Sequence, residues 1–547
     1  MQAIFATMRA SSLFQAASSF LGVQALNCSV GALQSALPSN ATVLSAVPVA
    51  GNGTYGQGAA DPAYPTNPTN LPALCAVYVN VTSSSSSSFR FGLFLPTEWN
   101  DRFLAVGNGG FAGGVNWLDM GAGVGYGFAV VSTDTGHNST SGVLNWAQDA
   151  PEVLNDWGYR AMHGSVELAK KLTAAYYGSQ IKYSYYSGCS TGGRQGIRSA
   201  QLYPEDFDGI LAGAPAWWTT HLQTWTAKMG TYNLPLNGSN RIDPSLFSVI
   251  GAEVLKQCDA QDGLADNIIS DPLRCNFNAE ALLCTPTSTS SACLTPAQLD
   301  TLYKVYSPYV DTNVSFVFPG FALGSESQWT VLLGTATGEP LSYGIDYIRY
   351  FLGLTDFQYQ DFDYSIVQLA DRLDPGNATA DDFDMRPYQA RGGKLLHYHG
   401  WADALIATGS SLHFYKQVAQ TLLPKGVDLD SWYRFFLVPG MQHCAGTPAG
   451  VDAPWYFAGG NQAADLGTGV HGVPGFEDGR HDALLALMEW VEEGTVVEEI
   501  VATKFVDEDV SKGVERQRPL CAYPKQAVYK GTGDVDAAES WECKSLY

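Results

Sequence analysis

Residues 187–196 read SGCSTGGRQG, and the five residues from Gly188 to Gly192 fit the pattern G-x-S-x-G. This pattern is typical of a sharp strand-to-helix turn that exposes a nucleophilic serine. Ser190 is the serine of the pattern, but Cys189 directly precedes it and is also a nucleophile by type. Which of the two acts depends on the partners that the rest of the chain supplies.

A serine hydroxyl is a weak nucleophile at neutral pH, so it needs a histidine base, and a carboxylate must fix the tautomer of that histidine. In α/β-hydrolases the carboxylate and then the histidine follow the serine, on loops after late strands. Asp403 ends the segment HGWAD after the apolar run 394–400, and His443 ends GMQH after the run 434–440. We therefore predict a catalytic triad of Ser190, Asp403 and His443.

Each member of this triad also has a plainer interpretation. The pattern G-x-S-x-G is a weak signal alone because Gly and Ser are common here, Asp403 could cap a helix, and His443 could be a structural loop histidine. The rival bases are His137, His163, His397, His399 and His481. His399 lies four residues before Asp403 and suits local structure better. The order of the three residues and their placement after strands favour the triad.

The oxyanion of a tetrahedral intermediate needs hydrogen-bond donors. The backbone N–H of Thr191, directly after the serine, is one candidate. The second should come from the loop after an early strand, and GNGGFAGG at 107–114 suits it because glycines let the backbone approach a substrate closely. Gly109 and Gly110 are the candidates, and the alternative is a plain flexible turn.

Two cysteines flank the predicted nucleophile and base. Cys189 precedes Ser190, and Cys444 follows His443. The serine and histidine of a triad lie within hydrogen-bond reach, so their chain neighbours are brought close as well. We therefore predict a Cys189–Cys444 disulfide, which makes Cys189 a cross-link and leaves Ser190 as the nucleophile.

These motifs resemble a known family. The run from Gly188 to Gly193, Asp403, and the pair His443-Cys444 are similar to the CS-D-HC arrangement of the tannase-like family, which includes tannases, fungal feruloyl esterases and a hydrolase of mono(hydroxyethyl) terephthalate. The resemblance extends from about residue 26 onward. It implies an α/β-hydrolase core with a large inserted lid domain.

Hydrophobic runs bounded by Gly, Pro and Asn predict the elements that position these residues. The strands are expected at 89–96, 102–110, 127–134, 182–188 and 208–215. Helices are expected at 156–177, with Asp156 as a cap, and at 192–204. This β-α-β alternation predicts a mainly parallel sheet and an α/β fold. It stops between 216 and 390 and resumes at 394–400 and 434–440, before a helix at 481–494.

We therefore expect four regions. The core comprises 26–215 and 391–547, and the lid domain comprises 216–390. Residues 1–25 are expected to hold either a cleaved signal peptide or an extra N-terminal segment. Val23-Gln24-Ala25 would suit signal peptidase, but Gln15 and four serines make a poor apolar core.

The chain has 547 residues, 46% of them hydrophobic, and a net charge of −23. This acidity argues against nucleic acid and anionic membranes as partners, because both require clustered Lys and Arg. No apolar run is long enough to predict a transmembrane helix. The sequence carries no signal for an oligomeric state.

Ten cysteines and many glycosylation sequons indicate an oxidising, secretory route. The sequons are at Asn27, Asn40, Asn52, Asn80, Asn138, Asn237, Asn313 and Asn377. No C-x-x-C pair occurs, which argues against a zinc ribbon. Besides Cys189–Cys444, the expected disulfides are Cys258–Cys275, Cys284–Cys293, Cys521–Cys543 and Cys28–Cys75.

Residues 258–275 form an acidic loop between two cysteines. Asp259, Asp262 and Asp266 place three carboxylates within eight residues around a glycine, and hard oxygen ligands at this spacing suit calcium. The family resemblance implies that the backbone carbonyls of Leu264 and Ile268 complete the shell of a structural Ca²⁺ in the lid. The alternative is a solvated acidic turn.

The sequence thus predicts a secreted serine carboxylesterase that needs no cofactor for its chemistry. By resemblance, its substrate is an ester of a hydroxylated aromatic acid, first a feruloyl ester or a feruloylated polysaccharide fragment. A tannase acting on galloyl esters is the alternative with the same residues. A non-catalytic carbohydrate-binding glycoprotein on a hydrolase fold is the alternative from another class, and an intact Ser, Asp and His set argues against it.

Overall fold

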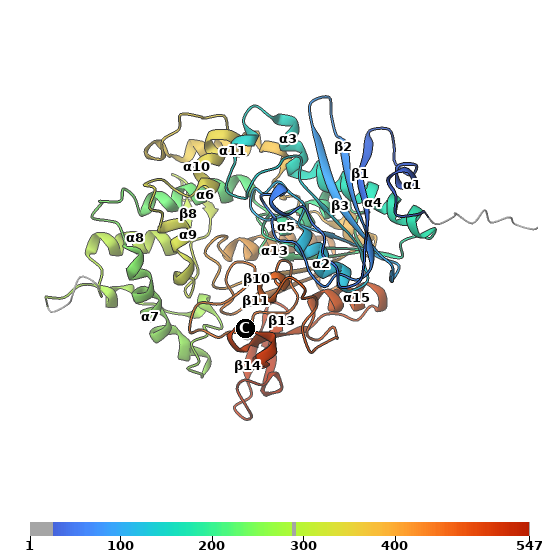
Figure 1. Cartoon of the computed structure of the whole chain (residues 1–547). Coiled ribbons are helices and arrows are strands. Elements are labelled where there is room, and N and C mark those ends of the chain that lie inside the picture. The colour runs from blue at the N-terminus through green and yellow to red at the C-terminus, as the bar shows by residue number, and fades with distance from the viewer. Residues whose placement is uncertain (1–25, 287–291, 546–547) are drawn as a thin grey trace, which may run out of the picture.

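The computed structural model describes residues 26–286 and 292–545 (Figure 1). The expected signal or N-terminal segment at 1–25 therefore lies outside the described residues. A nine-stranded sheet in the order β1-β2-β3-β5-β4-β6-β7-β10-β11 forms the centre of the molecule. Its strands are β1 (Ala41–Val49), β2 (Leu74–Thr82), β3 (Ser88–Pro96), β4 (Arg102–Val106), β5 (Ala129–Thr133), β6 (Tyr183–Cys189), β7 (Gly209–Gly213), β10 (Lys394–Gly400) and β11 (Tyr433–Val438).

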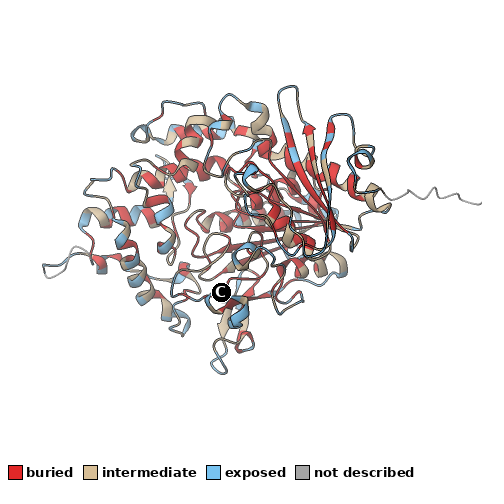
Figure 2. Ribbon diagram, viewed as in Figure 1, coloured by how far each residue is buried: buried red, intermediate tan, exposed pale blue. Residues whose placement is uncertain are grey.

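The sheet is mixed rather than wholly parallel. Strands β1, β2, β3 and β5 pair antiparallel in that order, whereas β5, β4, β6, β7, β10 and β11 pair parallel. The parallel strands are buried along nearly their whole length, as strands covered on both faces must be. Figure 2 shows this buried centre with exposed residues in the outer loops.

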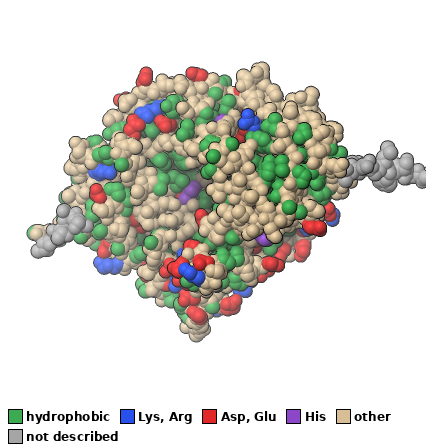
Figure 3. Space-filling view, viewed as in Figure 1, with side chains coloured by type: hydrophobic (Ala, Val, Ile, Leu, Met, Phe, Trp, Pro, Cys, Tyr) green, Lys and Arg blue, Asp and Glu red, His purple; other side chains and the backbone are tan. Residues whose placement is uncertain are grey.

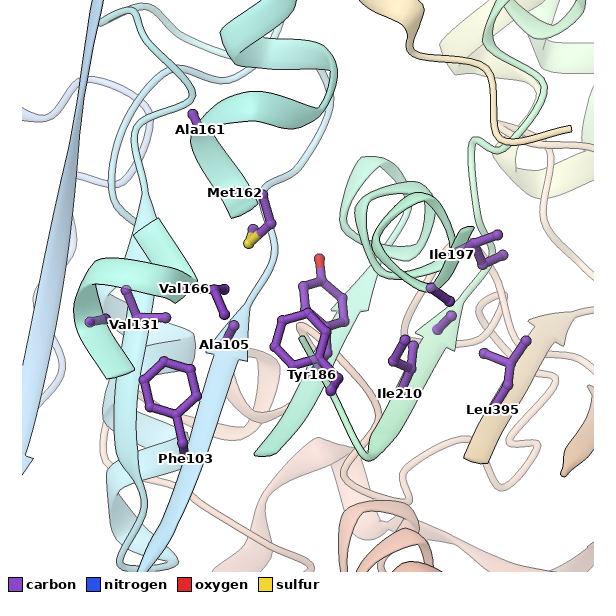
Figure 4. Packing of buried hydrophobic residues seen from close by; sticks show 14 of the residues in the cluster. Phe103, Ala105, Val131, Ala161, Met162, Val166, Tyr186, Ile197, Ile210 and Leu395 are labelled. Carbon is purple, nitrogen blue, oxygen red and sulfur yellow. The ribbon is translucent and has the colours of Figure 1, made fainter. Parts of the chain in front are cut away.

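Helices cover both faces of the sheet. One face packs against α4 (Ala161–Tyr177), α5 (Thr191–Leu202) and α13 (Gly409–Leu422), and Figure 4 shows part of this packing around Tyr186 and Val166. The other face packs against α2 (Trp117–Gly125) and α15 (Ala483–Glu493). This arrangement places the loops at the ends of the parallel strands side by side.

The helix expected at 156–177 begins earlier and is interrupted. It starts as α3 (Pro151–Asn155), where proline at the first position suits a helix start, passes through a π-helical turn η3 (Asp156–Arg160), and continues as α4. Asp156 is therefore not the cap that was predicted. Its buried carboxylate instead accepts hydrogen bonds from Ser83 and Ser87 of a serine-rich loop, at 2.8 and 2.5 Å.

The segment between β7 and β10 forms a separate layer, which we call the inserted segment (residues 216–390). Its described part contributes no strand to the nine-stranded sheet and lies beside it, coloured green to yellow in Figure 1. Two further hydrophobic clusters hold it together. Its main elements are α6 (Thr219–Tyr232), α7 (Phe247–Cys258), α8 (Pro296–Tyr306), β8 (Tyr309–Val310), β9 (Phe316–Phe318), α9 (Thr330–Leu333), α10 (Ser342–Asp346), α11 (Tyr364–Leu373) and α12 (Arg386–Ala390).

The C-terminal part adds two small antiparallel ribbons, β12 (Glu499–Phe505) with β13 (Val514–Cys521) and β14 (Lys525–Tyr529) with β15 (Trp541–Ser545). On the face shown in Figure 3, acidic side chains gather toward the lower edge, near this end of the chain. Within residues 26–286 and 292–545, no helix is long and apolar enough to cross a membrane.

Five disulfides cross-link the chain, and they are the five pairs expected from the sequence. They are Cys28–Cys75, Cys189–Cys444, Cys258–Cys275, Cys284–Cys293 and Cys521–Cys543.

The inserted segment contacts the π-helical turn at two glycines, Gly376 and Gly158, whose backbones pack closely. A Cβ built on Gly158 would overlap the backbone carbonyl of Gly376, which belongs to the turn η11 (Pro375–Asn377). We expect Gly158→Ala to lower the free energy of unfolding by about 1–3 kcal/mol, because backbone must move to admit the methyl group. Urea unfolding measures this change.

Gly31→Ala is the matched control, since a Cβ at Gly31 in the exposed helix α1 (Val30–Gln34) meets nothing within 4 Å. Equal stability of the two variants would contradict the close approach of Gly158 and Gly376.

Candidate active site

Ser190 stands at the turn between β6 and α5, with the backbone angles φ 64° and ψ −124°. Such a positive φ is strained for a residue with a side chain, and it turns the serine away from both elements. The turn is possible because its neighbours are small. A Cβ at Gly188 would lie 2.9 Å from the carbonyl carbon of Gly192, and one at Gly193 would overlap the carbonyl of Gly213. The glycines of the motif are therefore required by packing.

The carboxylate of Asp403 is fully buried in the loop after β10. Its Oδ2 atom accepts hydrogen bonds from His443 Nδ1 at 2.7 Å and His399 Nε2 at 3.0 Å. Its Oδ1 atom accepts from the backbone N–H groups of Leu405 and Ile406 at 2.8 and 2.9 Å. Burial alone raises the pKa of this carboxyl, but the charges and hydrogen bonds of His443 and His399 outweigh burial and hold the pKa far below its usual range.

His443 donates through Nδ1, because the carboxylate of Asp403 can only accept. This leaves Nε2 as the atom able to take a proton from a nucleophile. Cys189 and Cys444 join the immediate neighbours of Ser190 and His443, with a Cα–Cα distance of 5.9 Å. Among the described residues, no hydrogen bond links the Ser190 hydroxyl to His443, and such catalytic bonds often tighten only once substrate is bound.

His399, one of the rival bases, is fully buried and fixed on both ring nitrogens. Its Nε2 donates to Asp403 and to the carbonyl of Ile406, and its Nδ1 lies 2.7 Å from the hydroxyl of Ser411 in α13. It therefore holds Asp403 in place. The four-residue spacing between the two side chains was the signal for this local role.

The other rival histidines lie in contacts of their own. His137 stacks on Trp146, His163 pairs with Asp206, His481 pairs with Asp478, and His397 contacts Tyr433 and Ser411.

The two glycine candidates for the oxyanion hole differ in their hydrogen bonding. The Gly109 N–H donates to the hydroxyl of Tyr64 at 2.8 Å, so it is engaged. The Gly110 N–H has no acceptor among the described residues. The Thr191 N–H lies at the start of α5, where an amide has no intrahelical acceptor. The Thr191 hydroxyl donates to the Gly110 carbonyl at 2.7 Å and joins the two candidate donors.

Gln195 holds this glycine-rich loop against α5, a role that the sequence reasoning missed. Its side chain forms two hydrogen bonds to Asn108, one to the backbone N–H and one to the side-chain oxygen, both 3.0 Å long. Asn108 in turn donates to the carbonyls of Gly114 and Thr133. Because Gln195 lies one helical turn after Thr191, one helix sets the distance between the serine and the oxyanion loop.

The acidic loop is closed by its own backbone and by Arg518. Asp262 accepts from the Leu264 N–H, Asp266 accepts from the Ile268 N–H, and Asp259 accepts from the Asp266 N–H. Asp266 also forms an ion pair with Arg518 at 2.6 Å.

Burial raises the pKa of Asp259, and the charges of Asp266 and Asp262 raise it further. Among the described residues, however, no three acidic, histidine or cysteine side chains are gathered as a metal site. The expected shell also draws on the backbone carbonyls of Leu264 and Ile268, and the calcium site stays a prediction.

A family model described as "Tannase and feruloyl esterase" matches residues 75–339 and 349–544, which is most of the chain. The chain belongs to the tannase and feruloyl esterase family. Among similar proteins, "Probable feruloyl esterase B-1" from Aspergillus oryzae is 38% identical over 480 residues, covering 87% of this chain and 84% of the relative. "Probable feruloyl esterase B-2" from Aspergillus terreus is 36% identical over 476 residues, covering 86% of each.

Solved structures agree with the family assignment. The crystal structure of feruloyl esterase B from Aspergillus oryzae has a TM-score of 0.84 at 35% identity, covering 94% of this chain and 99% of that one. Tannin acyl hydrolase from Aspergillus niger has a TM-score of 0.73 at 21% identity, covering 95% and 96%, and shows the shared fold. The predicted α/β-hydrolase fold class and the predicted family are confirmed.

The Cys189–Cys444 disulfide is expected to hold His443 close to Ser190. We expect Cys189→Ala combined with Cys444→Ala to lower kcat much more than it raises KM, because a small misplacement of the base costs rate steeply. Steady-state kinetics on an ester measure this split. A loss of activity seen only together with global unfolding in circular dichroism would mean that the bond serves stability alone.

Proposed function

We propose that this chain is a serine carboxylesterase with Ser190 as nucleophile, His443 as base and Asp403 as the group that orients the base. The observation that carries this proposal is the bond between His443 and the buried Asp403 carboxylate, beside a disulfide that ties His443 to the Ser190 turn. The ionised carboxylate can only accept a hydrogen bond, so the proton of His443 stays on Nδ1 and the histidine is held in one tautomer.

The reaction follows from these positions. His443 Nε2 takes the proton of the Ser190 hydroxyl as its oxygen bonds to the ester carbonyl carbon. The N–H groups of Thr191 and Gly110 donate to the carbonyl oxygen as it gains negative charge. The C–O bond to the alcohol then breaks, and His443 returns the proton to the leaving oxygen. A water molecule, deprotonated by the same histidine, hydrolyses the acyl-enzyme and restores Ser190.

The substrate class rests on the relatives. Proteins named feruloyl esterase B cover most of this chain at 36–38% identity, so a feruloyl ester of plant cell-wall material is our first choice. A galloyl ester is the second candidate, because the tannin acyl hydrolase has the same fold. The panel that separates them comprises methyl ferulate, caffeate, sinapate and gallate, compared by kcat/KM. Highest kcat/KM on gallate would overturn the first choice.

We further propose that the protein is a secreted glycoprotein. Its five disulfides suit an oxidising compartment. Asn80 is half-buried, and the other sequon asparagines are exposed, as a glycan requires. These exposed residues are Asn27, Asn40, Asn52, Asn138, Asn237, Asn313 and Asn377. Mass analysis of secreted protein before and after glycosidase treatment tests this proposal.

The nucleophile is tested directly by Ser190→Ala. We expect kcat on the preferred ester to fall by roughly 10⁴-fold or more with the fold intact, since the base then has no hydroxyl to activate. Thermal unfolding provides the control for folding. Near-normal turnover in a folded variant would return Cys189 to consideration.

Calcium at the acidic loop is tested with paired variants. We expect calcium to raise the melting temperature of the wild-type protein, because a ligand that binds only the folded state stabilises it. Asp262→Ala combined with Asp266→Ala should remove that gain. Arg518→Met is the matched control: it removes the ion pair with Asp266 but keeps every carboxylate, so the gain should persist. Protein that contains no calcium by elemental analysis and melts unchanged with a chelator would refute the site.

A further inference from the structure

A cavity of about 400 Å³ lies between the inserted segment and the core, next to the loops that carry Asp403 and His443. Helix α7 and the short helix η8 (Glu326–Gln328) form its wall on the inserted segment. Trp401, Ala402 and parts of the 440–451 loop form its wall on the core. Ser190 and His443 do not line it, so it is separate from the proposed catalytic centre.

Glu326 supplies a buried polar group in this cavity, with only 2% of the residue exposed. Its Oε1 atom accepts from the hydroxyl of Tyr306 at 2.7 Å and from the Gly324 N–H at 3.0 Å. The backbone N–H of Glu326 itself also donates to this carboxylate, and no other residue donates to Oε2 among the described hydrogen bonds. Oε2 faces Gly251 instead, 3.6 Å from the position of a Cβ built there, and Gly251 also lines the cavity. A carboxylate can accept about four hydrogen bonds, so acceptor capacity is left for a ligand.

The remaining walls combine apolar residues that fit a ring with four exposed polar residues, Ser248, Asn267, Ser327 and Thr330. The main apolar members are Phe247, Leu255, Ile269, Leu323, Trp401 and Val451. A cavity of roughly 150 Å³ holds benzene, and ligand pockets run from about 300 to 1,000 Å³. This cavity therefore has room for one substituted ring. Burial raises the pKa of Glu326 against the opposing hydrogen bonds.

We propose that this cavity is a second ligand site that takes a neutral, ring-sized phenol, whose hydroxyl donates to Glu326 Oε2. The apolar walls cover the ring, and the single buried acceptor fixes its orientation. The site is defined by the cavity itself, so it does not depend on which ester the enzyme cleaves.

The helix that carries Glu326 also contacts both loops of the triad. Ser327 accepts a hydrogen bond from the side chain of Gln442, the neighbour of His443, at 2.9 Å. Gln328 accepts from the backbone N–H of Ala404, the neighbour of Asp403, at 2.8 Å. A ligand against Glu326 therefore adjoins a turn that supports both Asp403 and His443, and we infer that its binding changes the turnover number.

Binding is measured on the full chain after Ser190 has been blocked with a fluorophosphonate, so that the catalytic pocket is occupied. The probe is guaiacol, and 1,2-dimethoxybenzene is the matched compound without a hydroxyl donor. We expect calorimetry to show that guaiacol binds at one site per chain. We expect 1,2-dimethoxybenzene to bind about tenfold more weakly, because it has no hydroxyl to donate a hydrogen bond to Glu326 Oε2.

Two variants locate the site. Glu326→Gln keeps an acceptor for Tyr306 and turns the cavity-facing oxygen into an N–H donor, so guaiacol should bind about tenfold more weakly. Gly251→Leu fills the cavity and should abolish binding, whereas Gly31→Leu places the same side chain in an exposed helix where a Cβ meets nothing within 4 Å, and should not. Undetectable binding to the blocked wild type, or binding that both cavity variants leave unchanged, would overturn the site.

The coupling is tested by kinetics on the unblocked enzyme with its best ester. We expect guaiacol to change kcat at saturating ester in the wild type and to leave kcat unchanged in Gly251→Leu. An increase in KM alone, equal in both proteins, would place guaiacol in the ester's own pocket and would overturn the proposed coupling.

Discussion

The buried carboxylate of Asp403 is the constraint on which the site depends. A charge removed from water costs several kcal/mol unless other groups satisfy it, and here two imidazoles and two backbone N–H groups do so. The two histidines come from different segments of the chain. His399 lies in strand β10, one residue before its end, and contacts α13 through Ser411, while His443 lies in the loop after β11. One charge therefore orders the sheet edge, the covering helix and the base.

The nucleophile is placed by an independent set of contacts, and the disulfide joins the two sets. Ser190 has a positive φ, and close backbone packing at Gly188 and Gly193 leaves room only for glycine beside it. Gln195, one turn further along α5, holds the oxyanion loop through a hydrogen bond to Asn108. Cys189–Cys444 then ties the Ser190 turn to the histidine loop, although the strands that precede them, β6 and β11, are not neighbours in the sheet. The inserted segment adds support from outside, because Ser327 and Gln328 contact the neighbours of both His443 and Asp403.

The sequence predicted what depends on local pattern. The order of Ser190, Asp403 and His443, their placement after strands and the pairing of Cys189 all follow from short motifs on a known kind of sheet. It missed what depends on contacts between distant segments. The hydrogen bond from the Gly109 N–H to Tyr64 and the hydrogen bond between Gln195 and Asn108 have no signal in the local sequence. The sequence predicts Asp156 as a cap because aspartate favours that position, but the helix begins at Pro151 and Asp156 bonds the serine-rich loop instead.

The most direct test of the account is the site and rate of labelling by a fluorophosphonate, read by peptide mass mapping in the wild type and in Asp403→Asn. If the buried carboxylate activates Ser190 through His443, the wild type carries one adduct on Ser190, and the variant labels roughly 10⁴-fold more slowly while remaining folded. An adduct on another residue, or equal labelling rates in the two proteins, would contradict the account.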